Sequence, residues 1–356
     1  MIITRKKIRY PVSQALRQYL YHFDRQREIP EIYAELGRFS GAIPYEDPRG
    51  RETLWHTVMY PPDVFAELRP RLTAIYSELK LGRDAQQHRH LLVDRIDFGD
   101  FGNSRPFRIR ITNLFNDNSD YFYVKHADSS RIYGLELEHI LSPNRINYLV
   151  NGNTLIEEHI AGVPGDIFIR EYLNQPGLNQ VRIAKEFIKF NERNFVRLLG
   201  DMRSVNYVVD ITPDFEEIQY RVRAIDFDQQ SYEGGGNVYQ AFRFRSNRAV
   251  TRLAFAVINR ASIEQYVAEE HSQMGHRARD EGDRLRELLD VMRREQIAPG
   301  EHVATLARDL DRIHGTHDFC DCRTMGELTA RHITLLLGTA PGDQLVPPGM
   351  PDWKNT

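Results

Sequence analysis

The chain has 356 residues, of which 41% are apolar and 27% charged, a balance typical of globular proteins rather than disordered or fibrous ones. Its formal net charge is −3, so no overall field favours nucleic acid or an anionic membrane as a partner. The longest apolar runs, at residues 253–258 and 333–337, are far shorter than the roughly 20 residues of a membrane span. With two cysteines and no apolar stretch after the basic first residues, the sequence predicts a cytoplasmic protein of more than one core.

Residues 1–84 are expected to form a helical N-terminal extension. Leu16, Leu20 and Phe23 recur at helical spacing, and a second stripe of this kind runs through residues 65–79. Residues 40–51, rich in glycine and proline, are expected to form a loop between the two helices. These N-terminal helices are candidates for contact with a protein partner.

Residues 85–160 are expected to form a small, mostly β lobe. Phe107, Ile109 and Ile111 alternate as in a strand, and the turn formers at 116–120 predict a hairpin over residues 107–125. A helix is expected over residues 131–141, between this hairpin and two further strands at 148–150 and 154–159.

Residues 161–340 are expected to form a larger helical lobe. An apolar stripe from Ile183 to Phe195 predicts a helix, and two short strands follow at 207–209 and 222–225. Later helices are expected near residues 249–270, 284–296, 303–313 and 325–337. Residues 341–356 contain four prolines and are expected to form a loose tail, and the predicted fold class is α+β.

The residues that suggest chemistry lie at the ends of those two short strands. Asp201 and Asn206 precede the first strand, and Asp226 ends the second. Magnesium prefers oxygen ligands and is usually held by one or two carboxylates together with a substrate's phosphates. Phosphoryl transfer also needs a carboxylate that orients the attacking hydroxyl, and Asp201 is placed for this role. A DxxxxN string also arises by chance, and Asp201 could instead cap a turn.

The spacing from Asp201 to Asn206, followed by a strand hairpin and Asp226, resembles the protein-kinase-like superfamily. Gly200 before Asp201 makes the motif closer to the aminoglycoside and choline phosphotransferases. The resemblance implies a bilobal protein-kinase-like fold, ATP and Mg²⁺ as cofactors, and transfer of the γ-phosphate to a hydroxyl acceptor. It further implies these roles: Asp201 as catalytic base, Arg203 as a γ-phosphate contact, Asn206 and Asp226 as metal ligands, and Asp228 as a metal ligand or a residue behind one.

The resemblance also implies nucleotide contacts upstream. Lys125 would bind the α- and β-phosphates and pair with Glu136 or Glu138, which lie two apart and so point to different helix faces. The segment with Gly99 and Gly102 lies where a glycine-rich loop would cover the phosphates. The final strand of this lobe and the residues after it would meet adenine, with Glu158 and Ile160 as the contacts.

Three functions stay open at this point. The first is a phosphotransferase acting on a small molecule, and the second is a serine/threonine-type protein kinase, which Arg203 two residues after the base would also suit. The third is a nucleotide-binding scaffold without catalysis. A separate zinc site at His314, His317, Cys320 and Cys322 is a weaker alternative, because the CxC spacing differs from the usual CxxC.

Overall fold

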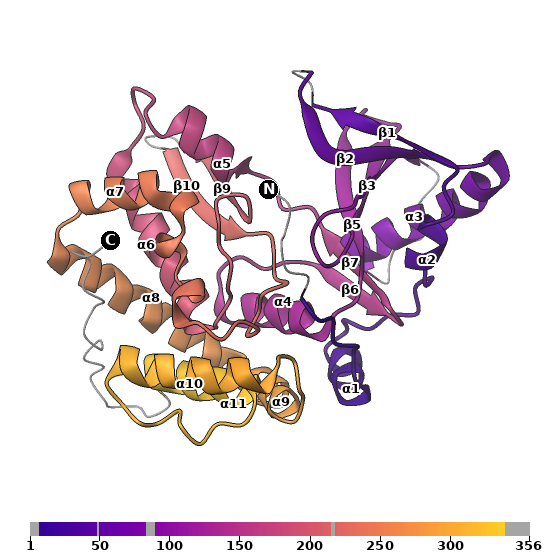
Figure 1. The fold of residues 1–356 in the computed structure, drawn as a ribbon. Coiled ribbons are helices and arrows are strands. Elements are labelled where there is room, and N and C mark those ends of the chain that lie inside the picture. Colours follow the sequence, from indigo (N-terminus) through magenta and orange to yellow (C-terminus); the bar gives the residue numbers. More distant parts are fainter. Residues whose placement is uncertain (1–6, 48–49, 83–89, 215–217, 339–356) are drawn as a thin grey trace. The chain divides into compact units, whose positions relative to one another are not determined.

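The computed structural model describes residues 7–47, 50–82, 90–214 and 218–338 (Figure 1). Its contacts divide the chain into a sheet unit, Met1–Ser129 with Ile146–His159, and a helical unit, Ser130–Arg145 with Ile160–Thr356. The predicted α+β class is confirmed by a seven-stranded antiparallel sheet accompanied by helices. No described helix combines the length and apolar character needed to cross a membrane. The expected tail at 341–356 lies outside the described residues.

The sheet unit is built on one antiparallel sheet with the strand order β1-β2-β3-β4-β5-β7-β6. Its strands are β1 (Gly41–Glu46), β2 (Glu52–Met59), β3 (Leu91–Gly99), β4 (Phe107–Asn113), β5 (Ser119–His126), β6 (Tyr148–Asn151) and β7 (Thr154–Glu158). Its helices are α1 (Gln14–His22), α2 (Tyr33–Leu36) and α3 (Pro62–Leu81). The predicted hairpin is confirmed as β4 paired with β5.

The core of the sheet unit follows the alternation seen in the sequence. Phe107, Ile109 and Ile111 of β4 are buried, and they belong to one apolar cluster with Leu68 and Leu72 of α3. The apolar residues of α3 thus pack into this core. Leu16 and Leu20 of α1 are also fully buried.

The expected helical extension is wrong for residues 41–46 and 52–59, which form two strands of the sheet. β2 pairs with β3, joining Trp55 to Gly99 and Thr57 to Asp97, and β1 pairs with β2 at the sheet edge. Residues 40–51 resemble a loop in sequence because they contain glycine and proline, including Pro44 of β1. The pairing of β1 with β2 shifts register just after Pro44. Proline lacks a backbone donor, so it is tolerated in an edge strand and rarely in a central one.

The helical unit contains a small sheet and most of the helices. Its sheet has the order β10-β9-β8, with β8 (Val163–Pro164), β9 (Tyr207–Pro213) and β10 (Ile218–Ala224). Its α-helices are α4 (Ser129–Leu141), which begins at the boundary, α5 (Gly165–Ile167), α6 (Gln180–Val196), α7 (Arg248–Val257), α8 (Arg260–Asp280), α9 (Gly282–Arg293), α10 (Gly300–His314) and α11 (Met325–Leu337). A five-residue π-helix, Phe168–Tyr172, follows α5.

Two features of the helical unit differ from expectation. The sequence grouped the helix at 131–141 with the β lobe, whereas its contacts place all but its first residue in the helical unit. The single helix expected near 249–270 is divided into α7 and α8. Asn259 between them has an extended backbone, and its side chain accepts a hydrogen bond from the N–H of Ser262. An asparagine in this position starts a new helix instead of continuing the old one.

Candidate active site

Asp201 lies in the loop after α6 in a left-handed backbone conformation, with φ of 59°. This conformation is unusual for a residue other than glycine and costs roughly 1 kcal/mol. The N–H of Asp201 donates to the carbonyl of Val238 at 3.0 Å, and its carbonyl accepts from the N–H of Arg203 at 2.8 Å. These bonds hold the loop in shape, and retained backbone strain of this kind clusters at functional sites.

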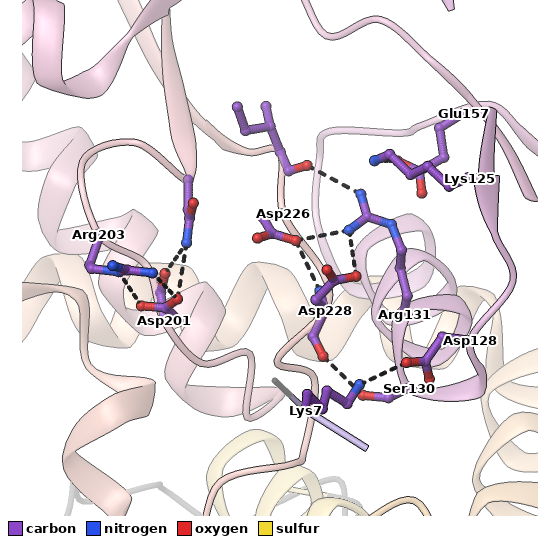
Figure 2. A network of polar contacts seen from close by, with 12 residues as sticks. Lys7, Lys125, Asp128, Ser130, Arg131, Glu157, Asp201, Arg203, Asp226 and Asp228 are labelled. Carbon is purple, nitrogen blue, oxygen red and sulfur yellow. Dashed lines mark hydrogen bonds and ion pairs between the residues drawn. The ribbon is translucent and has the colours of Figure 1, made fainter. Parts of the chain in front are cut away.

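The carboxylate of Asp201 is held on both oxygens by Arg203 (Figure 2). Nε of Arg203 donates to Oδ1 at 2.6 Å and Nη2 donates to Oδ2 at 2.7 Å, which is the strong, two-pronged form of this ion pair. The hydrogen bond to Asp201 is the main cause that raises the pKa of Arg203. The side chains of Asp201 and Arg203 are 26% and 29% exposed, so a ligand can reach them.

Asn206 connects Asp201 to the end of the β9–β10 hairpin. Its Nδ2 donates to the backbone carbonyl of Asp201 at 2.6 Å and to Oδ2 of the same residue at 3.3 Å. Its backbone carbonyl accepts from the N–H of Ile225 at 3.0 Å. The hairpin register explains this contact, because Tyr207 pairs with Ala224 and the next residues along both strands must meet. The structure therefore brings the Asp201 loop beside the strand end that carries Asp226.

Asp226 and Asp228 share a partner that the sequence analysis did not find, Arg131 of α4 (Figure 2). Nη1 of Arg131 donates to Oδ1 of Asp226 and to Oδ1 of Asp228, both at 2.8 Å. The N–H of Asp228 also donates to Oδ1 of Asp226, at 3.1 Å. Arg131 is 95 residues from Asp226 in sequence, so no local pattern could have indicated this contact.

The oxygen donors at this point fit a hard divalent cation such as magnesium. Asp226 supplies a carboxylate that is 35% exposed, and Asp228 supplies one that is 6% exposed. Because Nδ2 of Asn206 is directed at Asp201, Oδ1 of the amide is turned away from it. Across the described ranges no three His, Cys, Asp or Glu side chains gather as a metal site. A magnesium ion would therefore depend on one or two carboxylates, an amide oxygen and the oxygens of a phosphate ligand.

Lys125, on β5 of the sheet unit, pairs with Glu157 of β7, a residue that the sequence analysis did not single out. Nζ of Lys125 donates to Oε2 of Glu157 at 2.7 Å, and their side chains are 9% and 5% exposed. The strand register places Glu157 opposite Tyr123, two residues before Lys125, so both side chains project from the same sheet face. Strand alternation could have indicated this pair, had the register been known.

Glu136 and Glu138 of α4 are each bound by an arginine of the helical unit. Oε2 of Glu136 accepts from Nε of Arg284 at 2.9 Å, and Glu138 forms a deeply buried ion pair with Arg197. The two glutamates thus face different partners, as their spacing predicted. The expected pairing of Lys125 with one of them stays a prediction.

The segment with Gly99 and Gly102 links β3 to β4, where a glycine-rich loop was expected. Gly102 has φ of +70°, a conformation that favours glycine, and the N–H of Gly99 donates to the carbonyl of Pro106. The loop is also held from the N-terminus, since the N–H of Lys7 donates to Oδ1 of Asn103 at 3.0 Å. Whether this loop covers phosphates stays a prediction.

Of the two expected adenine contacts, Glu158 already uses its backbone N–H within the sheet unit. The N–H of Glu158 donates to the carbonyl of Asn147 at 3.0 Å, and its carboxylate accepts from the N–H of Asn147 at 2.7 Å. Glu158 therefore cannot present its N–H to a base without losing a strand hydrogen bond. Ile160 is 8% exposed and belongs to the helical unit.

The weaker zinc site at His314, His317, Cys320 and Cys322 is not formed, because no three such side chains gather among the described residues. Nε2 of His314 instead lies 2.9 Å from Nε2 of His332. Nδ1 of His332 lies 3.1 Å from the carbonyl of Val196 and can only donate to it. Burial lowers the pKa of His332, so its ring is neutral, its Nε2 is an acceptor and His314 donates to it. A hydrogen bond between the two Nε2 atoms needs one of them to be unprotonated, so the two rings cannot both be charged.

We expect this histidine pair to make the helical unit less stable as the pH falls from about 6.5 to about 4. Burial lowers the pKa of His314 from 6.5 to about 4, so the unfolded chain binds more protons than the folded chain across this interval. The loss should be on the order of 2 kcal/mol in the free energy of unfolding, measured in urea at pH 7.5 and pH 4.5. His314→Gln should reduce it, whereas His317→Gln, at an exposed position, should not. Equal pH dependence in all three proteins would contradict the expectation.

No protein-family model matches the sequence, and a search of curated proteins finds no match. The function has therefore to be inferred from the geometry and chemistry of the residues described above.

Proposed function

We propose that the chain is an ATP- and Mg²⁺-dependent phosphotransferase that moves the γ-phosphate to a hydroxyl group of a small molecule. The observation that carries this proposal is the convergence of Asp201, Asn206 and the Ile225–Asp226 strand end at the base of one hairpin. Two carboxylates and an amide oxygen in this arrangement suit a magnesium ion and an attacking hydroxyl. A bilobal protein-kinase-like fold is part of the same proposal.

Asp201 accepts the proton of the acceptor hydroxyl in this proposal. Its carboxylate is held in position by Arg203 and Asn206, and it becomes available to the acceptor hydroxyl when a phosphate draws Arg203 away. Arg203 lies against Asp201 and is also within electrostatic reach of Asp226, which suits a guanidinium that contacts the γ-phosphate between them. Asn206 and Asp226 would hold magnesium, which neutralises phosphate charge when bound. Lys125 is assigned to the nucleotide from its place in the sequence order alone.

A catalytically silent nucleotide-binding scaffold is the second candidate, favoured by one observation. Both oxygens of Asp201 are bound by Arg203, so the base is occupied in this arrangement. A phosphate that draws Arg203 away would release Asp201 for catalysis, whereas a scaffold would keep the pair closed. The protein-kinase alternative differs only in the acceptor, because fold and nucleotide site do not fix the second substrate. The cytoplasmic location stays a prediction.

The three functions are separated by incubation with γ-labelled ATP and Mg²⁺ over a panel of hydroxylated small molecules that includes aminoglycosides and choline. We expect the label to appear on a small molecule. Label on protein alone would support the protein kinase instead. A thermal shift with ATP and Mg²⁺ but no transfer to any acceptor would overturn catalysis and leave the scaffold.

A further inference from the structure

Two carboxylate oxygens of the candidate site converge on a single nitrogen. Oδ1 of Asp226 and Oδ1 of Asp228 both lie 2.8 Å from Nη1 of Arg131 (Figure 2). Proteins bind hard divalent cations in the same way, with two carboxylates directed at the ion. In this chain the cation between Asp226 and Asp228 is the guanidinium of Arg131.

The position of Arg131 is fixed rather than exchangeable. Its side chain is 2% exposed, and Nη2 reaches the carbonyl of Ile225 at 3.4 Å in addition to the two carboxylates. An arginine does not lose its charge at any ordinary pH. Moving it away would break both ion pairs of a buried guanidinium, one of them with the nearly buried Asp228, which is strongly unfavourable. Arg131 is therefore unsuited to act as a gate that opens for a metal ion.

We infer that Arg131 permanently takes the place of a divalent cation between Asp226 and Asp228. No magnesium ion is then held between Asp226 and Asp228, and a magnesium ion of the candidate site is bound through Asp226 alone of the two, whose side chain is 35% exposed. Asp228 serves as a positioning residue in this arrangement, because it helps to hold Arg131. The magnesium ion at Asp226 rests on the proposed function, whereas the role of Arg131 between the two aspartates does not.

Charge gives the inference a measurable consequence. Asp226, Asp228 and Arg131 together carry a net charge of −1. Replacing Arg131 by glutamine leaves the two carboxylates with a charge of −2 and with oxygens directed at the vacated point. A divalent cation should then bind between them, because carboxylate oxygens directed at one point are the ligands that such a cation prefers.

The test counts Mn²⁺ ions bound to the chain without nucleotide, from the electron paramagnetic resonance signal of free Mn²⁺. Arg131→Gln is expected to bind one more Mn²⁺ per chain than the wild type, at least about tenfold more tightly than any site of the wild type. Adding Asp228→Asn to this variant should remove the extra ion. Arg284→Gln is the matched control, since Arg284 pairs with the carboxylate of Glu136 away from the candidate site and its loss should add no such ion.

Circular dichroism would first establish that each variant is folded, and Arg131→Lys keeps the charge if glutamine is not tolerated. The lysine variant should bind as many ions as the wild type and Arg131→Ala should bind one more. Equal Mn²⁺ counts in the wild type and in folded neutral variants at position 131 would overturn the inference. The measurement needs neither ATP nor an acceptor, so a protein without phosphotransferase activity could still gain the ion, and an active one could fail to gain it.

Discussion

Asp201→Asn is expected to lower the turnover number for ATP-dependent phosphate transfer by about 10³-fold. The amide is the same size as the carboxylate and can still accept a hydrogen bond from Arg203, but it cannot take a proton from the acceptor hydroxyl. The KM for ATP should change little, because Asp201 is assigned to the acceptor and not to the nucleotide. Steady-state kinetics with the acceptor found in the labelling screen would measure both quantities.

The matched control for this substitution is Asp283→Asn, which removes a carboxylate that is 94% exposed in the same unit. It should leave the turnover number unchanged. Asp201→Asn should remain folded, because the side chain is partly exposed and the loop is also held by the backbone bond to Val238. A folded Asp201→Asn protein with full activity would refute the role of Asp201 as the base.

The local part of the site was predictable from sequence, because its contacts are short in sequence and follow from one hairpin. Once two apolar strands of similar length are expected on either side of a polar connection, Asn206 and Ile225 must meet at their open end. The loop from Asp201 to Asn206 spans only six residues and is joined by its own side chains. The predicted convergence of these residues therefore depends on no contact with residues far away in the sequence.

The ion pairs of Arg131 and Lys125, in contrast, join residues that are far apart in the sequence. Arg131 meets Asp226 across 95 residues, and Lys125 meets Glu157 across 32. A charged side chain that is buried needs a partner of opposite charge, but the sequence contains many residues that could be that partner. The choice is made by tertiary packing. This is why the sequence analysis did not single out Arg131 or Glu157 as partners.

The missed strand β1 shows a second limit, in the fold. Pattern reading relies on alternation between a buried and an exposed face, and β1 has none, because every residue in it is at least partly exposed. Its edge position tolerates Pro44 and two small residues, Gly41 and Ala42, which together resemble a loop. Central strands such as β4 alternate clearly and were predicted correctly.

Substitutions at Asp226 and Asp228 are expected to separate activity from stability. Asp226→Asn should abolish Mg²⁺-dependent phosphate transfer, lowering it by at least about 10³-fold, because the amide offers a neutral oxygen where a charged metal ligand is needed. Its effect on stability should be small, since the side chain is 35% exposed and Arg131 keeps its contact with Asp228.

Asp228→Asn should instead lower the free energy of unfolding by about 2 kcal/mol or more, because Asp228 is 6% exposed and its loss leaves Arg131 buried beside a single, partly solvated carboxylate. Urea denaturation of the two variants, beside transfer assays with Mg²⁺, measures both effects. The opposite order, with Asp226→Asn the less stable protein and Asp228→Asn the less active one, would mean that the metal is held by the buried aspartate and that Arg131 is paired mainly with the exposed one.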